Sequence, residues 1–149
     1  MSQTSKLNQH CSVVEINQRG ILIVGLSGTG KTSLALGLLE RAEQRGLSSS
    51  LICDDQAILS SDGKSLVANA PKAIAGKIEL RGFGVIEHPY KQSAQINLVA
   101  EICEDDAIER MPGQNYIKLC DIALPHLRVP RQHEALASRI IFAWLNQFG

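Results

Sequence analysis

The sequence predicts an α/β fold in which a mixed sheet with flanking helices carries a phosphate-binding loop. Residues 25–32 read Gly-Leu-Ser-Gly-Thr-Gly-Lys-Thr and fit the phosphate-loop pattern of Gly, four residues, Gly-Lys and Ser or Thr without a mismatch. An aliphatic run at 21–24 precedes the loop, and a segment of helical period follows it at 32–45. Alternating segments typical of strands fill most of the chain up to a second amphipathic segment at 134–148.

Length and charge set broad limits on the protein. The 149 residues suit one domain. We assign residues 10–149 to a single phosphate-loop catalytic domain and residues 1–9, which are polar and aperiodic, to a disordered tail. The 15 basic and 15 acidic residues balance, so the bulk charge favours neither a nucleic acid nor a membrane surface as a partner.

The cysteines and the apolar runs bear on the compartment. The four cysteines are far apart and form no Cys-x-x-Cys pair, so we expect free thiols rather than a zinc site. The N-terminus has no apolar signal core, and no run approaches the ~20 apolar residues that span a bilayer. A reducing cytoplasm is the expected location.

The elements around the loop follow from local patterns. Residues 12–16 and 21–24 read as strands joined by a turn at 17–20, so a β-hairpin leads into the loop and indicates a partly antiparallel sheet. In the following helix, Leu34, Leu38 and Ala42 share one face, and Gly46 is suited to its end.

The second half of the chain is predicted to be rich in strands. After a short apolar strand at 51–53, further strands are expected at 65–68, 77–81, 95–102, 115–120 and 122–129, with a loop at 108–113. The last segment, 134–148, has a helical period that places Leu136, Ile140, Ala143, Trp144 and Phe148 on one face.

The chemistry of the loop follows from its residue types. Glycines let the backbone curl so that its N–H groups and the helix start point at an anion. Lys31 adds positive charge, and Thr32 offers a hydroxyl to Mg²⁺. A glycine-rich turn that binds nothing is the alternative, but the order of strand, loop and helix favours phosphate binding. The candidate nucleotide-binding residues are Gly25, Leu26, Ser27, Gly28, Thr29, Gly30, Lys31 and Thr32.

Phosphoryl transfer also needs a base, a metal shell and often a guanidinium on the developing charge. Asp54 and Asp55 follow the strand at 51–53 and can divide between proton acceptor and metal shell, or simply form a solvated turn. Glu79 is a hard oxygen ligand suited to Mg²⁺, although its strand pattern alone favours an exposed face.

Basic side chains fill the remaining roles. Arg81 and Arg110 are candidate phosphate clamps, since a guanidinium matches two phosphate oxygens, whereas most surface arginines have no such role. His10 is suited to orienting a carboxylate, although a lone histidine is more often structural.

Four segments add up to a family pattern. His10 stands fifteen residues before Gly25. Residues 51–55 form an apolar run ending in Asp-Asp, residues 78–85 read Ile-Glu-Leu-Arg-Gly-Phe-Gly-Val, and residues 108–111 read Ile-Glu-Arg-Met. With the loop, these segments resemble the catalytic domain of the HPr kinase/phosphorylase family, bacterial enzymes that phosphorylate a serine of the phosphocarrier protein HPr. The family has an aliphatic residue in place of Phe83 and Asp-Arg-Leu in the last segment.

The resemblance implies a phosphate-loop kinase fold akin to phosphoenolpyruvate carboxykinase, with ATP and Mg²⁺ as cofactors. It implies HPr as protein substrate, dephosphorylation by phosphorolysis as a second direction, a place in regulating the phosphotransferase system and carbon metabolism, and a homo-oligomer, specifically a hexamer. It makes Asp54 the proton acceptor, tuned by His10, with Asp55 left for the metal shell. The implied catalytic residues are His10, Lys31, Asp54 and Arg110, and the implied metal residues are Thr32, Glu79 and Asp55.

Two departures from the family narrow this expectation. Longer members carry an N-terminal domain that this chain has no residues to form ahead of His10. Many members also have Gly-Arg-Asn, tied to dephosphorylation, where this chain has residues 129–134, so the kinase direction is better supported. The alternatives are a small-molecule phosphate-loop kinase, a phosphoenolpyruvate-carboxykinase-like enzyme, or a nucleotide-binding regulator without turnover.

Overall fold

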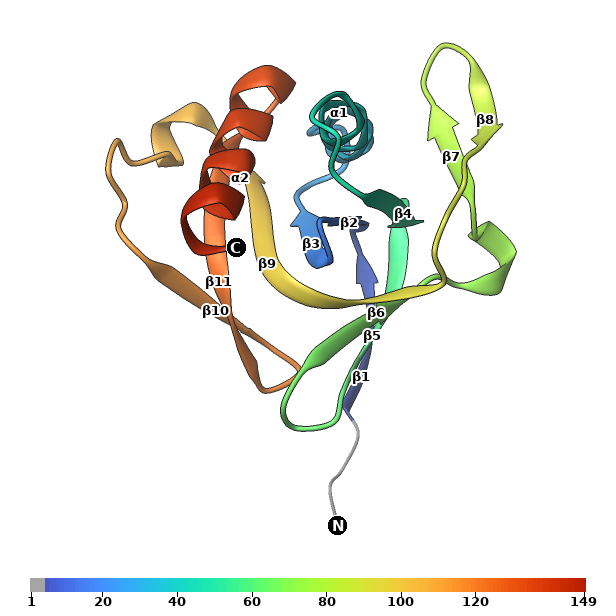
Figure 1. Ribbon diagram of the computed structural model, residues 1–149, viewed down its shortest axis with the longest axis horizontal. Helices are drawn as coiled ribbons and strands as arrows, with labels where there is room; N and C mark the ends of the chain where they lie inside the picture. The colour runs from blue at the N-terminus through green and yellow to red at the C-terminus, as the bar shows by residue number, and fades with distance from the viewer. Residues whose placement is uncertain (1–4) are drawn as a thin grey trace.

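The structure is a computed structural model that describes residues 5–149, and it is built on one large mixed sheet (Figure 1). The strands are β1 (Ser5–His10), β2 (Ser12–Ile16), β3 (Arg19–Val24), β4 (Ser49–Cys53), β5 (Gln56–Ser61), β6 (Leu66–Asn69), β7 (Lys77–Leu80), β8 (Gly84–Glu87), β9 (Ser93–Cys103), β10 (Asn115–Leu119) and β11 (Ile122–Pro130). The helices are α1 (Lys31–Gln44) and α2 (Glu134–Phe148), with 3-10 turns at Lys72–Ile74 and Asp105–Ala107.

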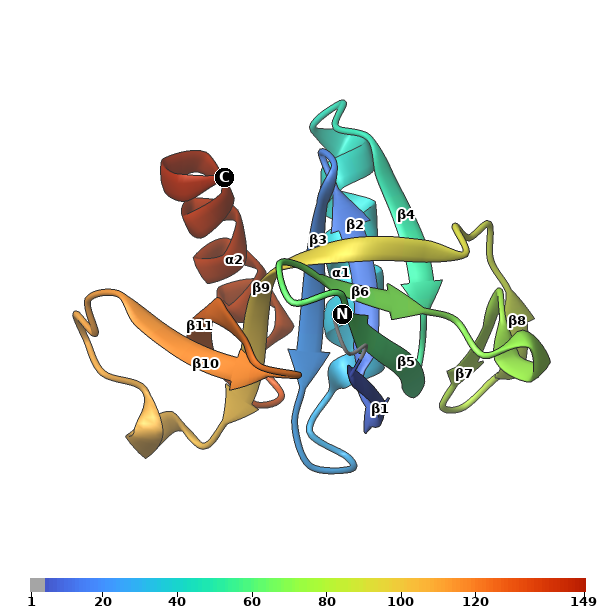
Figure 2. The ribbon, with the colours of Figure 1, turned by 90° about the horizontal axis from the view of Figure 1, so that it is seen from below.

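Strand β9 organises the sheet. The main strand order is β1-β5-β6-β9-β3-β2-β4. β11 also pairs with β9, along residues 99–103, and β10 pairs with β11. β9 is parallel to β3 and β11 but antiparallel to β6. It can serve all three because it is long and curved (Figures 1 and 2). The predicted α/β class with a mixed sheet and flanking helices is therefore confirmed.

The predicted hairpin before the loop is also present. β2 and β3 pair antiparallel, with a turn at Asn17 and Gln18. Both turn residues have positive φ, 52° and 67°, as a two-residue turn matched to the twist of the strands requires. The hairpin places the end of β3 at the sheet edge where the phosphate loop begins.

The N-terminal segment differs from its prediction. We expected residues 1–9 to be a disordered tail, but Ser5–His10 forms strand β1 and pairs antiparallel with β5. The pairing runs from Ser5 opposite Ser61 to His10 opposite Gln56. Edge pairing satisfies backbone groups whatever the side chains are, so a polar, aperiodic sequence does not reveal it. Residues 1–4 of the expected tail lie outside the described residues.

The sheet buries a core on each face, as alternating strands require. Val14 and Ile23 face the two helices, whereas the neighbouring Val13 and Leu22 face the cluster formed with β5 and β6. All four side chains are fully buried. The central strands are thereby fixed from both sides, which holds their ends in place at the site.

Helix α2 packs through a different face from the predicted one. Its buried residues are Ala137, Ser138, Ile141 and Phe142. The predicted face of Leu136, Ile140, Ala143, Trp144 and Phe148 is half-buried or exposed. The helix is apolar around more than half of its circumference, so periodicity alone does not decide which face meets the sheet.

Strands β7 and β8 form a separate two-stranded sheet. This hairpin stands at one side of the molecule next to α1 in Figure 1. Among the described residues, no helix has both the length and the apolar character needed to cross a membrane.

Candidate active site

The phosphate loop connects the end of β3 to the start of α1. Gly28 and Gly30 have φ of 79° and 102°, a conformation that favours glycine. A Cβ on Gly25 would lie 2.8 Å from the Thr29 hydroxyl, so the first glycine is needed for close packing within the loop. The loop glycines thus have the physical roles that the sequence pattern predicts.

Lys31 lies folded over its own loop. Its Nζ donates to the carbonyl oxygens of Gly25 at 3.0 Å and Leu26 at 3.3 Å. The Thr29 hydroxyl donates to the same Leu26 oxygen at 2.6 Å. The ammonium is therefore held at the loop by weak neutral acceptors, which an anionic phosphate oxygen can replace with a charge-assisted contact.

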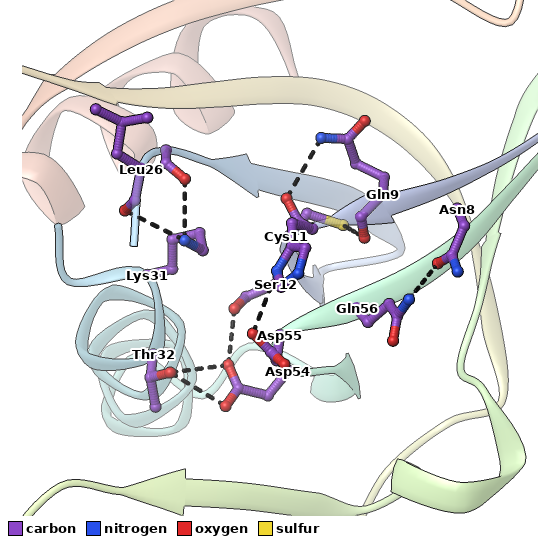
Figure 3. Close-up of polar contacts among 12 residues, drawn as sticks. Asn8, Gln9, Cys11, Ser12, Leu26, Lys31, Thr32, Asp54, Asp55 and Gln56 are labelled. Atoms are coloured by element: carbon purple, nitrogen blue, oxygen red, sulfur yellow. Dashed lines mark hydrogen bonds and ion pairs between the residues drawn. The ribbon is translucent and has the colours of Figure 1, made fainter. Parts of the chain in front are cut away.

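Asp54 is buried and joins two hydroxyl groups (Figure 3). The side-chain oxygens of Asp54 accept from Thr32 Oγ1 at 3.0 and 3.1 Å, and Oδ1 also accepts from Ser12 Oγ at 2.7 Å. Asp54 is only 5% exposed and Ser12 is not exposed at all. Asp54 thus links the end of β4 to the start of α1.

Asp55 has a different environment from its neighbour. Its side chain is 72% exposed, and its backbone has a φ of 76°. The left-handed turn at this residue points the two consecutive carboxylates in different directions. His10 Nδ1 lies 3.4 Å from Asp55 Oδ1, and the Cys11 N–H donates to the Asp55 carbonyl at 3.1 Å. The family resemblance implied that His10 tunes Asp54, whereas in this structure the turn presents Asp55 to His10.

One cavity unites the loop with residues from distant segments. It has a volume of about 550 Å³ and is lined by the phosphate loop and the start of α1. Asp55, Glu79 and Arg81 line it from the other side, so the structure brings residues of two of the family segments, 51–55 and 78–85, to the loop. A third part of the wall includes Gln132 and His133, which lie between β11 and α2, and Glu134, the first residue of α2.

A family model described as HPr Serine kinase C-terminal domain matches residues 2–148. The chain belongs to this family. Among its relatives, the HPr kinase/phosphorylase of Lactobacillus acidophilus is 31% identical over 133 residues, which cover 81% of this chain and 39% of that protein. HPr kinase/phosphorylase 1 of Oceanobacillus iheyensis is 32% identical over 150 residues, covering 92% of this chain and 46% of that protein. The chain thus spans less than half the length of these relatives.

A solved structure has the same fold. The structure of the Hpr(Ser) kinase/phosphatase from Coxiella burnetii matches with a TM-score of 0.78 at 21% sequence identity. The match covers 96% of this chain and 99% of that one. The resemblance stated from four sequence segments is thereby confirmed for the family and for the fold.

Arg110 is not where the family pattern led us to expect it. It lines a second cavity, of about 600 Å³, together with Leu136 and Ile140 of α2. It is not among the residues that line the phosphate cavity. Within the described part of a single chain, Arg81 is therefore the arginine that lines the phosphate cavity.

Several residues of this site were not predicted from the sequence, among them Gln132 and Ser12. The Gln132 N–H donates to the Thr29 carbonyl at 3.3 Å, and its Nε2 lies 3.5 Å from the Gly28 carbonyl. No short motif marks Gln132, because its role depends on where β11 ends. Ser12 did carry a signal, since it is a hydroxyl residue directly before the apolar pair Val13 and Val14.

The residues at the loop fit a magnesium ion. Thr32 and Asp54 supply hard oxygen atoms at the start of α1, and Glu79 supplies another from across the cavity. Among residues 5–149 no three His, Cys, Asp or Glu side chains form a metal cluster. Magnesium beside a nucleotide does not require one, because it is held by one or two protein groups, water and phosphate oxygens.

The Cys11 thiol beside the site is not a nucleophile. Cys11 and Cys53 are fully buried and flank the segments that carry Ser12 and Asp54. The hydrogen bond with Cys53 and burial raise the pKa of the Cys11 thiol far above its usual range. Cys11 therefore stays a neutral thiol at physiological pH, which excludes it as a thiolate nucleophile.

Proposed function

We propose that the chain is a Mg²⁺- and ATP-dependent protein kinase that phosphorylates a serine of HPr. The observation that carries this proposal is the shared cavity, in which the phosphate loop faces Asp55, Glu79 and Arg81, with His10 in contact with Asp55. The names of the relatives, HPr kinase/phosphorylase, support the choice of substrate. A donor site and an exposed base in one open cavity suit an acceptor hydroxyl carried by another protein.

Asp55 is the proposed proton acceptor. The serine oxygen attacks the γ-phosphorus of ATP, the bond to the ADP oxygen breaks, and the serine proton passes to Asp55. His10, 3.4 Å away, orients the Asp55 carboxylate. This exchanges the two aspartates of the family analogy: the exposed Asp55 replaces the buried Asp54 as the base, and Asp54 takes the place near the metal.

The loop and its helix hold the phosphates in this proposal. The loop N–H groups and the N-terminus of α1 bind phosphate oxygens, and Lys31 moves from its carbonyl partners to the β- and γ-phosphates. Bound Mg²⁺, held through Thr32 and Glu79, would neutralise negative charge on the phosphates. Arg81 lines the same cavity and is suited to stabilising charge as it develops on the transferred group.

The proposed location, oligomeric state and reverse reaction each rest on a separate observation. We propose a cytoplasmic location from the cysteines, which are free among the described residues. Assembly into a homo-oligomer, the hexamer of the family, rests on the family resemblance. The reverse reaction, in which inorganic phosphate removes the phosphoryl group from HPr, rests on the word phosphorylase in the relatives' names.

The test is direct phosphorylation. Purified protein, ATP, Mg²⁺ and HPr are incubated, and HPr is examined by intact mass and peptide mapping. We expect one added phosphate on a serine, and we expect Lys31→Ala to lose nucleotide affinity and rate together. A wild-type protein that binds ATP but leaves HPr unmodified would overturn the kinase proposal in favour of a nucleotide-binding regulator.

A further inference from the structure

Ser12 is a buried hydroxyl residue with no role in the proposed reaction so far. The described part of the chain buries few polar or charged residues: Ser12, Thr29, Asp54, Ser61 and Ser138. Two of them, Ser12 and Asp54, are bonded to each other across 42 residues of sequence. Burial of a polar side chain is costly unless it is hydrogen-bonded. Ser12 and Asp54 each satisfy this requirement through the other.

Two hydroxyl groups contact the Asp54 carboxylate (Figure 3). Ser12 Oγ donates to Oδ1 at 2.7 Å, the shortest of the three contacts to this carboxylate. Thr32 Oγ1 lies 3.0 Å from Oδ1 and 3.1 Å from Oδ2. A hydroxyl has one proton, so Thr32 donates to one oxygen at a time. Oδ1 has two lone pairs, so it can accept from Ser12 and Thr32 together, and Ser12 holds the carboxylate in the orientation that faces Thr32.

The direction of the Thr32 proton matters for the metal. When Thr32 donates to Asp54, its proton points into the protein and its oxygen lone pairs are left for the cavity side. A metal ion needs those lone pairs. By accepting this hydrogen bond, the Asp54 carboxylate fixes the orientation of the Thr32 hydroxyl in which its oxygen can bind a cation.

We infer that Ser12 is a positioning residue for the metal site, acting through Asp54 on Thr32. The inference rests on the proposed Mg²⁺- and nucleotide-binding function of the loop. Ser12 comes from β2, Asp54 follows β4, and Thr32 begins α1, so the chain of contacts ties three elements to one hydroxyl orientation. Without Ser12, the buried Asp54 keeps Thr32 as its only remaining side-chain donor and can rotate.

The experiment measures metal binding rather than turnover. Mn²⁺, which is visible by electron paramagnetic resonance and replaces Mg²⁺, is titrated into the protein with saturating ADP. We expect Ser12→Ala to weaken Mn²⁺ binding roughly 10–100-fold, the usual effect of removing a group that orients a metal ligand. ADP affinity without metal should stay near the wild-type value.

Ser61→Ala is the matched control. Ser61 is also a buried strand serine, and its Oγ accepts from the Gly63 N–H on the far side of the sheet from the loop. It removes a comparable hydroxyl without touching Asp54. Equal Mn²⁺ affinities for Ser12→Ala and Ser61→Ala would overturn the inference.

Two further comparisons separate positioning from packing. The Thr and Val side chains have nearly the same shape and differ in the hydroxyl. Mn²⁺ binding retained in Ser12→Thr and lost in Ser12→Val supports the inference even if Ser12→Ala does not fold.

In an Asp54→Asn background, Ser12→Ala should have little further effect on Mn²⁺ affinity. A full loss in that background would show that Ser12 acts independently of Asp54 and would refute the inference. Because the readout is metal binding, a protein that fails to phosphorylate HPr leaves this test intact.

Discussion

At the scale of single residues, the division between Asp54 and Asp55 is the sharpest result. Two identical side chains, adjacent in the chain, have opposite environments because Asp55 adopts a left-handed turn. Asp54 is enclosed by hydroxyl donors, whereas Asp55 faces the cavity beside His10. The sequence predicts that the pair divides between base and metal shell, but the division depends on one φ angle that no motif encodes.

The two asparagine variants test this division. We expect Asp55→Asn to slow phosphoryl transfer to HPr about 10²–10⁴-fold, the usual range for loss of a general base, with metal and nucleotide binding retained. Asp54→Asn should instead weaken the metal-dependent part of nucleotide binding. Single-turnover phosphorylation and calorimetric titration of ADP, with and without Mg²⁺, give the two readouts.

Asp62→Asn serves as the control for these variants. Asp62 is an exposed aspartate in the turn after β5, where it accepts from the Lys64 and Ser65 N–H groups. It should leave both readouts at the wild-type level. If Asp54→Asn abolishes transfer with binding intact while Asp55→Asn is fully active, the original family analogy is right and our exchange of roles is wrong.

At the scale of elements, the sequence correctly predicted those helices, strands and loops whose form depends on neighbouring residues in the chain. The loop, the hairpin before it and α1 follow from glycine placement and periodicity within about 35 residues. The predictions for residues 5–9 and for the packing face of α2 were wrong, because each depends on a partner distant in sequence. Residues 5–10 form strand β1 by pairing with β5. The buried face of α2 is the one that packs against the sheet and α1. The same limit explains Gln132, whose contact with the loop joins residues far apart in sequence.

Gly20 shows how a predicted turn residue becomes part of the sheet. It lies in β3, opposite Ile96 of the central strand β9, at a register irregularity. A Cβ at Gly20 would lie 2.1 Å from the Gln95 carbonyl oxygen, a main-chain atom that cannot rotate away. The two strands approach this closely only because residue 20 has no side chain.

We therefore expect Gly20→Ala to lower the free energy of unfolding by about 1–3 kcal/mol, the usual cost of forcing extra atoms into a packed interior. Urea unfolding followed by circular dichroism measures it. Ala123→Val, which adds methyl groups at an exposed position of β11, is the control and should change stability by less than ~0.5 kcal/mol. An unchanged stability for Gly20→Ala would mean that β3 and β9 are not this close.

At the scale of the whole molecule, the site is assembled from the ends of many segments. The loop that follows β3, Asp55 after β4, Glu79 in β7 and Gln132 after β11 all line one cavity. His10, the last residue of β1, contacts Asp55. Among the predicted catalytic residues, Lys31 lines the phosphate cavity, Asp54 contacts Thr32 and His10 contacts Asp55, whereas Arg110 lines a separate cavity against α2. If Arg110 has a catalytic role, either a second copy of the chain or a rearrangement within the chain must bring it to the loop.

This gives the last prediction, which concerns assembly. With the proposed homo-oligomer, we expect Arg110→Ala and Lys31→Ala to be inactive alone and to regain activity when mixed under conditions that exchange subunits. Random exchange at equal amounts places an intact Lys31 opposite an intact Arg110 at roughly a quarter of the sites in a symmetric assembly. HPr phosphorylation measures the recovery, and light scattering measures the mass of the assembly.

Full activity of Arg110→Ala alone would remove Arg110 from the catalytic residues. No recovery on mixing would mean that Arg110 acts within its own chain, through a rearrangement that carries it from the α2 cavity to the loop.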